Sequence, residues 1–222
     1  MIEHVYRRAA AAPGVEAVVV ATDDARIALT VERFGGIVRM TRSIHRTGTD
    51  RIAEVAAHLE CDIVINVQGD LPVLEPETIA QVLQPFENDP AARMSTLRRL
   101  ITDAADYHNP NVVKVVVNQQ GHALYFSRAP VPFVRASIFE AAGLSLPAFK
   151  HIGLYAYRRD FLLTLASLPQ TPLEVAESLE QLRVLENGFR IHTVETQHES
   201  IEVDTPEDIE RVRRLVTVET RA

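Results

Sequence analysis

The stretch VINVQGDLP (residues 64–72) places a short apolar run directly before an amide, a glycine, a carboxylate and a proline. Its β-branched residues predict a buried strand, and the glycine and proline predict that the strand ends there. In open α/β sheets ligands bind beyond the carboxyl ends of the strands, so Gln68 and Asp70 are expected to face a pocket. Asp70 also suits Mg²⁺, which prefers hard oxygen ligands. The alternative is that Asp70 simply caps the helix that follows.

Neighbouring segments alternate between strand and helix patterns. Apolar β-branched or aromatic runs predict strands at 16–22, 62–68, 111–118 and 122–128. Between them, apolar residues at three-and-four spacing predict helices at 23–36, 48–60 and 75–89. Strands that alternate with helices predict an α/β fold, in which a mostly parallel twisted sheet carries helices on both faces.

The second half of the chain departs from this alternation. Two strands around a polar turn at Gly121 predict a hairpin, and residues 150–162 predict a strand that runs into a helix. We therefore expect an antiparallel insertion at roughly 119–160 within one domain spanning residues 1–222. Residues 172–188 predict one continuous helix, with proline at its start and glycine past its end. A last helix is predicted to begin at Thr205.

The composition excludes some classes of protein. A net charge of −7 argues against a general nucleic-acid binder, which needs a basic surface. No run is long and apolar enough to predict a membrane span, and the N-terminus has no signal-peptide character. Cys61 is the only cysteine, so no intramolecular disulfide can form. We expect a cytoplasmic protein in which this thiol packs in the interior.

A second carboxylate lies far from the first along the chain. Asp204 ends a short apolar run at 201–203 and directly precedes the last predicted helix. Asp70 and Asp204 could therefore converge on one cation at the edge of the sheet. The alternative is that Asp204 only caps the last helix.

A set of sequence blocks occurs in the order and spacing of one known family. They are HRTGTDRIAE, NVQGDLP, NPNVVKVV, ALYFSRAPVPF, KHIGLYAYR, PLEVAESLEQLRVLENG and VDTPEDIERVR. Together they resemble the 3-deoxy-manno-octulosonate cytidylyltransferases, also called CMP-Kdo synthetases, from Met1 nearly to Arg214. The resemblance implies the fold of the nucleotide-diphospho-sugar transferases.

The resemblance also implies a reaction. Family members join CTP and the sugar acid Kdo to give CMP-Kdo and pyrophosphate, for lipopolysaccharide synthesis. The anomeric hydroxyl of the sugar attacks the α-phosphorus of CTP, and Mg²⁺ offsets charge on the phosphates. Asp70 and Asp204 match the family's metal-binding aspartates, and are the expected catalytic pair.

Other positions carry over from the family one at a time. Gly48, Thr49 and Arg51 match the loop that contacts the nucleotide, although TGTD also predicts a turn and a helix N-cap, a role that Thr49 would fill without any ligand. Gln68 matches a side chain that lies between nucleotide and sugar. The positions that match the remaining sugar contacts are Arg128, His151, Tyr155, Glu180 and Gln181.

Those sugar-side positions also have ordinary structural interpretations. A guanidinium suits a carboxylate ligand, but Arg128 could instead form a surface ion pair. His151 and Tyr155 are four apart in a predicted strand and so share one face of the sheet. Periodicity places Glu180 and Gln181 on the polar flank of the 172–188 helix, which is ordinarily solvated.

The chain also departs from the family pattern. Family members begin with a buried strand and a phosphate-binding loop close to ARxxSxRLPGKPL, and Met1 aligns just after it. We expect either a recorded start inside a longer chain, which we favour, or a shortened form; the sheet would lack a central strand. Leu71 stands where a Glu is usual and is expected to make the mouth of the site less acidic. Glu202 replaces a Gly beside Asp204, so a related sugar acid could be preferred.

Three further expectations complete the sequence analysis. A catalytically impaired homologue that binds a sugar acid, or that pairs with an active subunit, is the alternative to an active enzyme. A nicotinamide-dependent oxidoreductase ranks last, because no G-x-G-x-x-G follows any predicted strand. The resemblance implies a homodimer formed through the antiparallel insertion.

Overall fold

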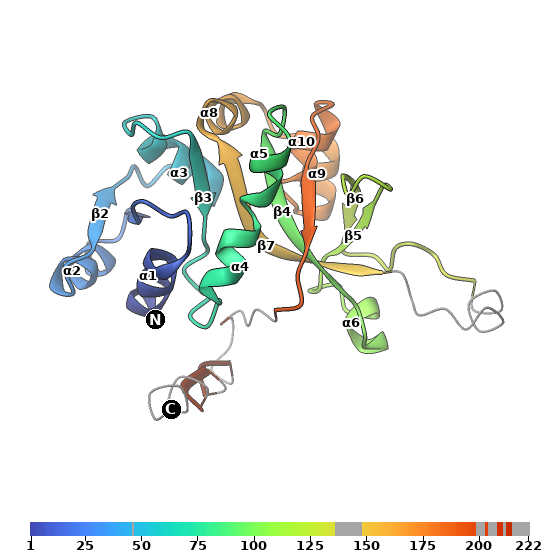
Figure 1. Ribbon diagram of the computed structural model, residues 1–222, viewed down its shortest axis with the longest axis horizontal. Coiled ribbons are helices and arrows are strands. Elements are labelled where there is room, and N and C mark those ends of the chain that lie inside the picture. The colour runs from blue at the N-terminus through green and yellow to red at the C-terminus, as the bar shows by residue number, and fades with distance from the viewer. Residues whose placement is uncertain (46, 136–147, 199–202, 204–207, 211, 215–222) are drawn as a thin grey trace.

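The computed structural model describes residues 1–45, 47–135, 148–198, 203, 208–210 and 212–214. Within them the strands are β1 (Val19–Thr22), β2 (Ile37–Met40), β3 (Ile63–Asn66), β4 (Met94–Leu100), β5 (Lys114–Val117), β6 (Ala123–Ser127), β7 (Phe149–Arg158) and β8 (His192–Glu195). β1 and β2 form a two-stranded parallel sheet (Figure 1). The other strands form a six-stranded sheet in the order β6-β5-β7-β4-β8, with β3 also paired to β7.

The larger sheet is mixed, so the expectation of a mostly parallel sheet is wrong. β7 runs antiparallel to β3, β4 and β5, whereas β4 and β8 are parallel. β3 and β4 therefore point the same way, as a βαβ crossover requires, but β7 lies between them. Alternation of strands and helices predicts the crossover, and it does not reveal that a later strand is inserted into the gap.

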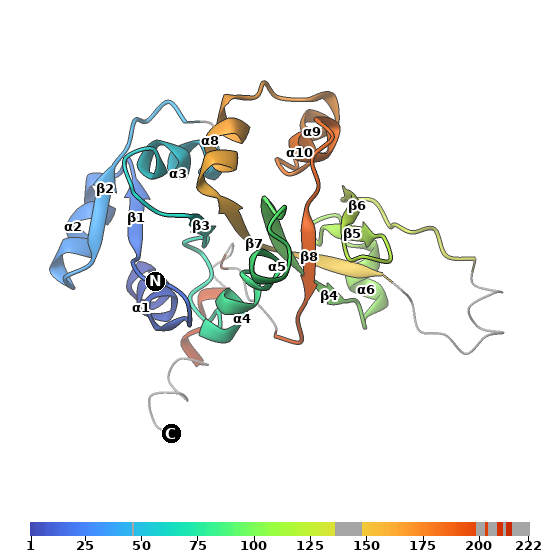
Figure 2. The same cartoon turned by 45° about the horizontal axis from the view of Figure 1, so that its top comes forward.

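Helices cover both faces of the larger sheet, as expected. They are α1 (Ile2–Ala11), α2 (Ala25–Arg33), α3 (Gly48–Ala56), α4 (Pro76–Gln81), α5 (Gln84–Asn88), α6 (Ala104–His108), α8 (Arg159–Ser167), α9 (Pro172–Glu177) and α10 (Leu182–Glu186). One core cluster packs α3, α8 and α10 against the sheet, and a second packs α1, α4 and α5 against its other face (Figure 2). Alternating side chains of β4 and β7 feed both clusters.

The predicted helix at 172–188 is broken. α9 ends at Ser178, whose φ of 52° and ψ of 48° are left-handed, and α10 starts at Leu182. A left-handed residue stops a helix because the next N–H groups turn back onto the preceding carbonyls. Periodicity continues through the break, which is why the sequence indicates one helix. The predicted helix at 75–89 is also divided, into α4 and α5, but Val82 and Leu83 between them keep right-handed helical angles.

Two smaller expectations can also be compared with the structure. Cys61 is exposed, so its expected packing role is wrong. Residues 208–210 and 212–214 are helical, within the predicted last helix, while Thr205 lies outside the described residues. Across the described part of the chain, no helix combines the length and the apolar character that crossing a membrane demands.

Candidate active site

The predicted nucleotide loop forms the N-terminus of α3. Thr47 is the N-cap, and its Oγ1 accepts a hydrogen bond from the backbone N–H of Asp50 at 3.1 Å. The cap expected at Thr49 is therefore at Thr47 instead: Gly48 and Thr49 occupy the first turn, and Thr49 is only 3% exposed. Both interpretations of TGTD are therefore compatible, because a capped helix N-terminus still presents N–H groups and a partial positive charge to an anion.

Arg51 ties this helix to the carboxyl ends of β1 and β2. Its Nη1 donates to Thr41 Oγ1 at 2.6 Å and lies 3.0 Å from Asp23 Oδ1. Asp23 directly follows β1, and Thr41 directly follows β2. The side chain thus lies at the strand-end edge, where ligands of α/β proteins bind.

Gln68 and Asp70 follow β3 at the same kind of edge. The Oδ1 atom of Asp70 is buried, and the backbone carbonyl of Asp70 accepts a hydrogen bond from the N–H of Val203 at 3.0 Å. Val203 directly precedes Asp204 in the sequence, so the chain returns to Asp70 one residue before the second predicted carboxylate. Asp204 itself lies outside the described residues.

Leu71 does not line the mouth of this site. Its side chain is 1% exposed and belongs to the core cluster that α1 and α4 share. The expectation that Leu71 makes the mouth less acidic is therefore wrong, because strand-end position alone does not show which way a side chain turns. Glu202 lies outside the described residues.

His151 and Tyr155 lie together on one face of β7, as predicted. Their ring centroids are 5.3 Å apart. The ring of Phe126 from β6 is nearly perpendicular to that of His151, with 5.0 Å between the two ring centroids. The register of β7 against β4 shifts between these residues, where Gly153 and Leu154 are extra. Two inserted residues keep the alternation of faces intact, so both rings remain on the same side.

Thr96 of β4 determines the tautomer of His151. Its Oγ1 lies 2.9 Å from His151 Nε2, and also 2.8 Å from the carbonyl of Leu154 and 3.2 Å from that of Ile152. Carbonyls only accept, so the single hydroxyl proton goes to them and His151 Nε2–H is the donor to Thr96. His151 Nδ1 is then left as an acceptor. Burial lowers the pKa of His151 to about 3, so the ring is neutral near pH 7.

Arg128 follows β6 and is held by backbone carbonyls. Its Nε donates to the carbonyl of Glu177 at 2.9 Å, and its Nη1 donates to that of Pro110 at 3.1 Å. Within the described part of the chain, its guanidinium forms no ion pair with a carboxylate, so the surface ion pair considered for Arg128 is not formed there. The positive charge remains available to an anionic ligand.

Glu180 and Gln181 lie in the break between α9 and α10, and the expectation of a solvated flank is wrong for both. Gln181 is 5% exposed, and Glu180 is largely buried. Burial raises the pKa of Glu180, an effect that the hydroxyls of Thr47 and Thr49 partly offset. Its Oε1 is buried and accepts no hydrogen bond from the described residues. The break turns both side chains inward, and it places Glu180 against the first turn of α3.

A buried ion pair fixes the segment that carries them. Arg183 Nη2 donates to Glu174 Oε1 at 2.5 Å and Nε donates to Oε2 at 2.9 Å, with both side chains no more than 4% exposed. Glu174 Oε2 also accepts from the N–H of Thr171 at 3.1 Å. Burial raises the pKa of Glu174, but Arg183 and this N–H outweigh it and bring the pKa below its usual value.

Sequence reasoning missed several residues that shape the site. They are Thr47, Thr96, Lys114, Tyr157 and Glu177. Lys114 carries the clearest sequence signal, since a lysine in the centre of VVKVVV interrupts an otherwise apolar strand. Tyr157 has no such signal; burial and the nearby Glu180 carboxylate raise its pKa, and the hydroxyl of Thr49 counters this.

The structure brings most predicted site residues to two adjoining regions. Glu180 joins them, because it belongs to the α9–α10 break and lies against the α3 turn that carries Thr49. Asn66 at the end of β3 lies opposite Tyr155 of β7, so Gln68 follows β3 toward the same region. Among the described residues no group of three His, Cys, Asp or Glu side chains could hold a metal ion.

Comparison with known proteins identifies the family. A family model described as Cytidylyltransferase matches residues 1–201. The 3-deoxy-manno-octulosonate cytidylyltransferase of Geobacter sulfurreducens is 54% identical over 217 residues, which are 96% of this chain and 87% of that protein. The protein of the same name from Pelobacter propionicus is 53% identical over 218 residues, which are 96% of this chain and 86% of that protein.

A solved structure agrees with these relatives. The structure of CMP:2-keto-3-deoxy-manno-octonic acid synthetase complexed with CTP is 45% identical, with a TM-score of 0.90, and the match covers 98% of this chain and 88% of that one. The α/β fold is therefore of the nucleotide-diphospho-sugar transferase type, and the family expected from the sequence blocks is confirmed. The chain belongs to the 3-deoxy-manno-octulosonate cytidylyltransferase family.

Proposed function

We propose that this protein transfers a cytidylyl group from CTP to 3-deoxy-manno-octulosonate and releases pyrophosphate. The observation that carries the proposal is the position of Glu180, which lies against the α3 turn predicted to bind the nucleotide while belonging to the predicted sugar side. Two substrates bound to these regions would lie next to one another. Such proximity is what a direct displacement at the α-phosphorus of CTP requires.

The sugar-side residues suit an acidic, hydroxyl-rich ligand. Arg128 offers N–H groups and a positive charge to the sugar carboxylate. Glu180 Oε1 and His151 Nδ1 are acceptors for sugar hydroxyls, and the neutral state of His151 leaves the positive charge to Arg128. Each interaction orients the anomeric hydroxyl without itself supplying the nucleophile.

On the nucleotide side, the capped N-terminus of α3 faces the phosphates, and Arg51 and Gln68 contact the nucleotide. We propose that Asp70 and Asp204 hold Mg²⁺ between the two substrates. The buried Oδ1 of Asp70 is a hard oxygen ligand, and Val203, whose N–H donates to the carbonyl of Asp70, directly precedes Asp204 in the sequence. Bound Mg²⁺ would neutralise charge on the triphosphate and on the attacking oxygen.

Pyrophosphate release from CTP and Kdo tests the proposal. We expect release only with Mg²⁺ present and faster with CTP than with UTP, ATP or GTP. Asp70→Asn should lower kcat by about 100-fold or more, because a neutral amide is a poor metal ligand. Asp62→Asn, at the exposed opposite end of β3, is the matched control and should retain activity. A folded protein that releases no pyrophosphate from CTP with Kdo would contradict the proposal, and release with a different sugar acid would redefine the acceptor.

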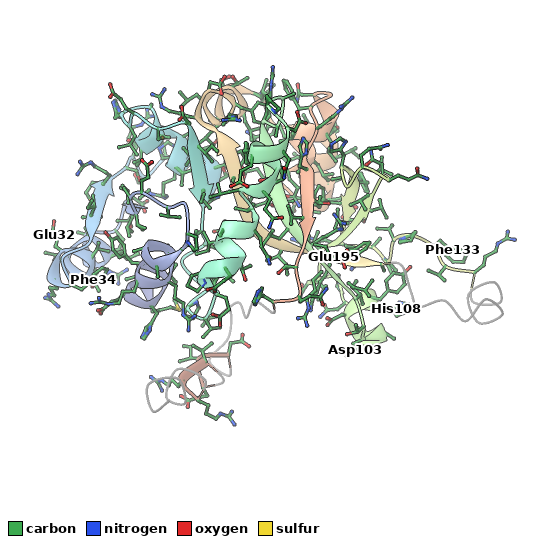
Figure 3. The ribbon with its side chains drawn as sticks, viewed as in Figure 1. Glu32, Phe34, Asp103, His108, Phe133 and Glu195 are labelled. Atoms are coloured by element: carbon green, nitrogen blue, oxygen red, sulfur yellow. The ribbon has the colours of Figure 1, made fainter. Side chains whose placement is uncertain are left out.

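We further propose a homodimer formed through the segment that follows β6. Phe133 is 87% exposed, on an arm that projects away from the sheet (Figure 3), and Leu124 on β6 is 60% exposed. Exposed apolar side chains of this size favour a protein–protein interface. Light scattering should give about twice the monomer mass, and Phe133→Asp should shift it toward the monomer. A monomer at micromolar concentration would contradict the dimer.

The remaining expectation concerns the compartment. The exposed free thiol of Cys61 suits a reducing environment, so we propose that the protein acts in the cytoplasm. Fractionation of the native host, followed by detection of the chain, tests this.

A further inference from the structure

Lys114 is a buried ammonium group with no solvent contact. The residue is 0% exposed at the start of β5, between β6 and β7, where burial lowers the pKa of its side chain and the nearby Arg128 adds to this effect. Its Nζ donates to the carbonyls of Val112 and Arg128 at 2.6 Å and to that of Asn109 at 2.9 Å. These three bonds use all the donors of the ammonium group. Burial of a charge costs free energy unless it is fully hydrogen-bonded, so this lysine has a specific structural task.

Glu177 of α9 also binds Arg128, the residue whose carbonyl Lys114 contacts. Its Oε2 accepts from the backbone N–H of Arg128 at 2.9 Å, and its Oε1 accepts from the hydroxyl of Ser127 at 2.6 Å. The backbone carbonyl of Glu177 also accepts from Arg128 Nε at 2.9 Å. Burial raises the pKa of Glu177, but these donors outweigh it and bring the pKa below its usual value. Glu177 is therefore a charged acceptor near pH 7.

Arg128 is consequently fixed at its backbone and at its side chain. Lys114 holds its carbonyl, Glu177 holds its N–H, and two of its five guanidinium N–H groups bind backbone carbonyls. The other guanidinium N–H groups have no partner within the described part of the chain. A guanidinium anchored along one edge presents its other edge in a fixed direction.

We propose that Lys114 and Glu177 are positioning residues that orient the free edge of Arg128 toward the carboxylate of the acidic substrate. This inference rests on the proposed function, because it assigns the sugar carboxylate to Arg128. The Lys114 ammonium and the Glu177 carboxylate hydrogen-bond the backbone of Arg128 and groups next to it, so they act on the substrate through Arg128. Their opposite charges also leave Arg128 as the net positive charge of the group.

Steady-state kinetics of Glu177→Gln and Lys114→Met provide the test. A glutamine at 177 is neutral and has one acceptor oxygen in place of two, so it cannot accept from both Ser127 and the N–H of Arg128, and the charge-assisted bond is lost. Each variant should raise KM for the sugar acid by about 10- to 100-fold and leave KM for CTP within about 2-fold, because only the sugar carboxylate loses its partner. Ser127→Ala, which keeps the charge of Glu177, should have a smaller effect.

Glu186→Gln is the matched control. Glu186 lies on the neighbouring α10 and accepts hydrogen bonds from the N–H groups of Leu173 at 3.0 Å and Glu174 at 3.3 Å, without contact to Arg128. This variant should change stability and leave KM for the sugar acid unchanged. If Lys114→Met does not fold, Glu177→Gln and Ser127→Ala still test the inference.

A double-mutant cycle distinguishes action through Arg128 from a general structural role. Arg128→Met alone should raise KM for the sugar acid, and adding Glu177→Gln to Arg128→Met should not raise that KM any further. The inference would be overturned if Glu177→Gln raised KM for the sugar acid equally with and without Arg128. It would also be overturned if KM for the sugar acid and KM for CTP rose equally. Unchanged KM in Arg128→Met would instead overturn the assigned role of Arg128.

A spectroscopic measurement decides the inference independently of activity. In ¹⁵N-labelled protein, the Nε–H of Arg128 should exchange slowly, because it is bound to the carbonyl of Glu177. This protection should be lost in Glu177→Gln and Lys114→Met and retained in Glu186→Gln. Retained protection in both positioning variants would overturn the inference, whereas an inert wild-type enzyme with the expected exchange pattern would count against the proposed function alone.

Discussion

The two regions that meet at Glu180 are built differently. On the nucleotide side, β1 pairs only with β2 among the described residues, and the Arg51–Asp23 pair is 22% and 34% exposed. On the sugar side, β7 lies inside a six-stranded sheet, and the Glu174–Arg183 pair is no more than 4% exposed. Buried polar networks thus hold the sugar side, whereas partly exposed contacts hold the nucleotide side.

Because of this difference, the sugar side is the more preorganised part of the site. Thr96, Lys114, Glu174 and Glu177 each fix a sugar-side residue or the segment that carries one, through buried or partly buried hydrogen bonds. Groups that are already ordered lose little entropy when a ligand binds, so the sugar acid meets a site close to its bound form. A two-stranded sheet is only marginally stable by itself, so the strand ends on the nucleotide side should open more easily.

Hydrogen exchange tests directly whether the two regions differ in local stability. Backbone amides of β4 and β7 should exchange about a thousand-fold more slowly than those of β1, because opening of the central strands approaches global unfolding. Mass spectrometry of peptides that cover 19–22, 94–100 and 149–158 measures the difference. Equal protection in all three peptides would show that the two regions open as one unit.

Removal of the buried ion pair should have the largest effect among the substitutions. Arg183→Met leaves the Glu174 carboxylate buried without its partner, so the free energy of unfolding should fall by about 3–5 kcal/mol. Urea denaturation measures it. Arg213→Met removes a pair with Glu210 in which both side chains are more than 60% exposed, and should cost at most about 1 kcal/mol. Similar costs would mean that burial of the sugar-side pair is unimportant.

His151 should make the sugar side sensitive to acid. Its folded pKa of about 3 lies below the ordinary value of 6.5, so between these values the unfolded state binds the proton more strongly. Neutral His151 makes its full contribution to the free energy of unfolding above the unfolded pKa. That contribution should be lost as pH falls, at up to about 1.4 kcal/mol per pH unit. Urea midpoints from pH 7 to pH 5 should fall more steeply in the wild type than in His151→Gln. Parallel curves would show that His151 titrates normally.

The smallest expected effect is at the break between α9 and α10. Ser178 has a left-handed backbone, which glycine adopts without a Cβ penalty. Ser178→Gly should therefore raise the free energy of unfolding by about 0.5–1 kcal/mol while leaving the break in place. Ser178→Val should lower it, since a β-branched residue is strained there. A higher free energy of unfolding for Ser178→Val and a lower one for Ser178→Gly would contradict the left-handed conformation of Ser178.

Sequence patterns predicted the elements better than their arrangement. The apolar runs located β1, β3, β5 and β6, and the strand that runs into a helix at 150–162 became β7 and α8. The sheet direction was wrong because pairing depends on where β7 enters, which local composition does not encode. Of the site, His151 and Tyr155 could be placed together by alternation, whereas the inward turn of Glu180 and Gln181 could not, because Ser178 carries no signal of its left-handed backbone.

Local sequence was sufficient to identify the family, through ordered blocks that carry strand-end polar residues such as Gln68 and Asp70, and to locate most helices and strands through periodicity. Only the tertiary structure decided which polar residues are buried and what holds them: Thr96 beside His151, and Lys114 with Glu177 around Arg128. The physical reason is that periodicity depends on near neighbours in the chain. Satisfaction of a buried charge or hydroxyl depends on partners from distant segments, which only folding brings within hydrogen-bond distance.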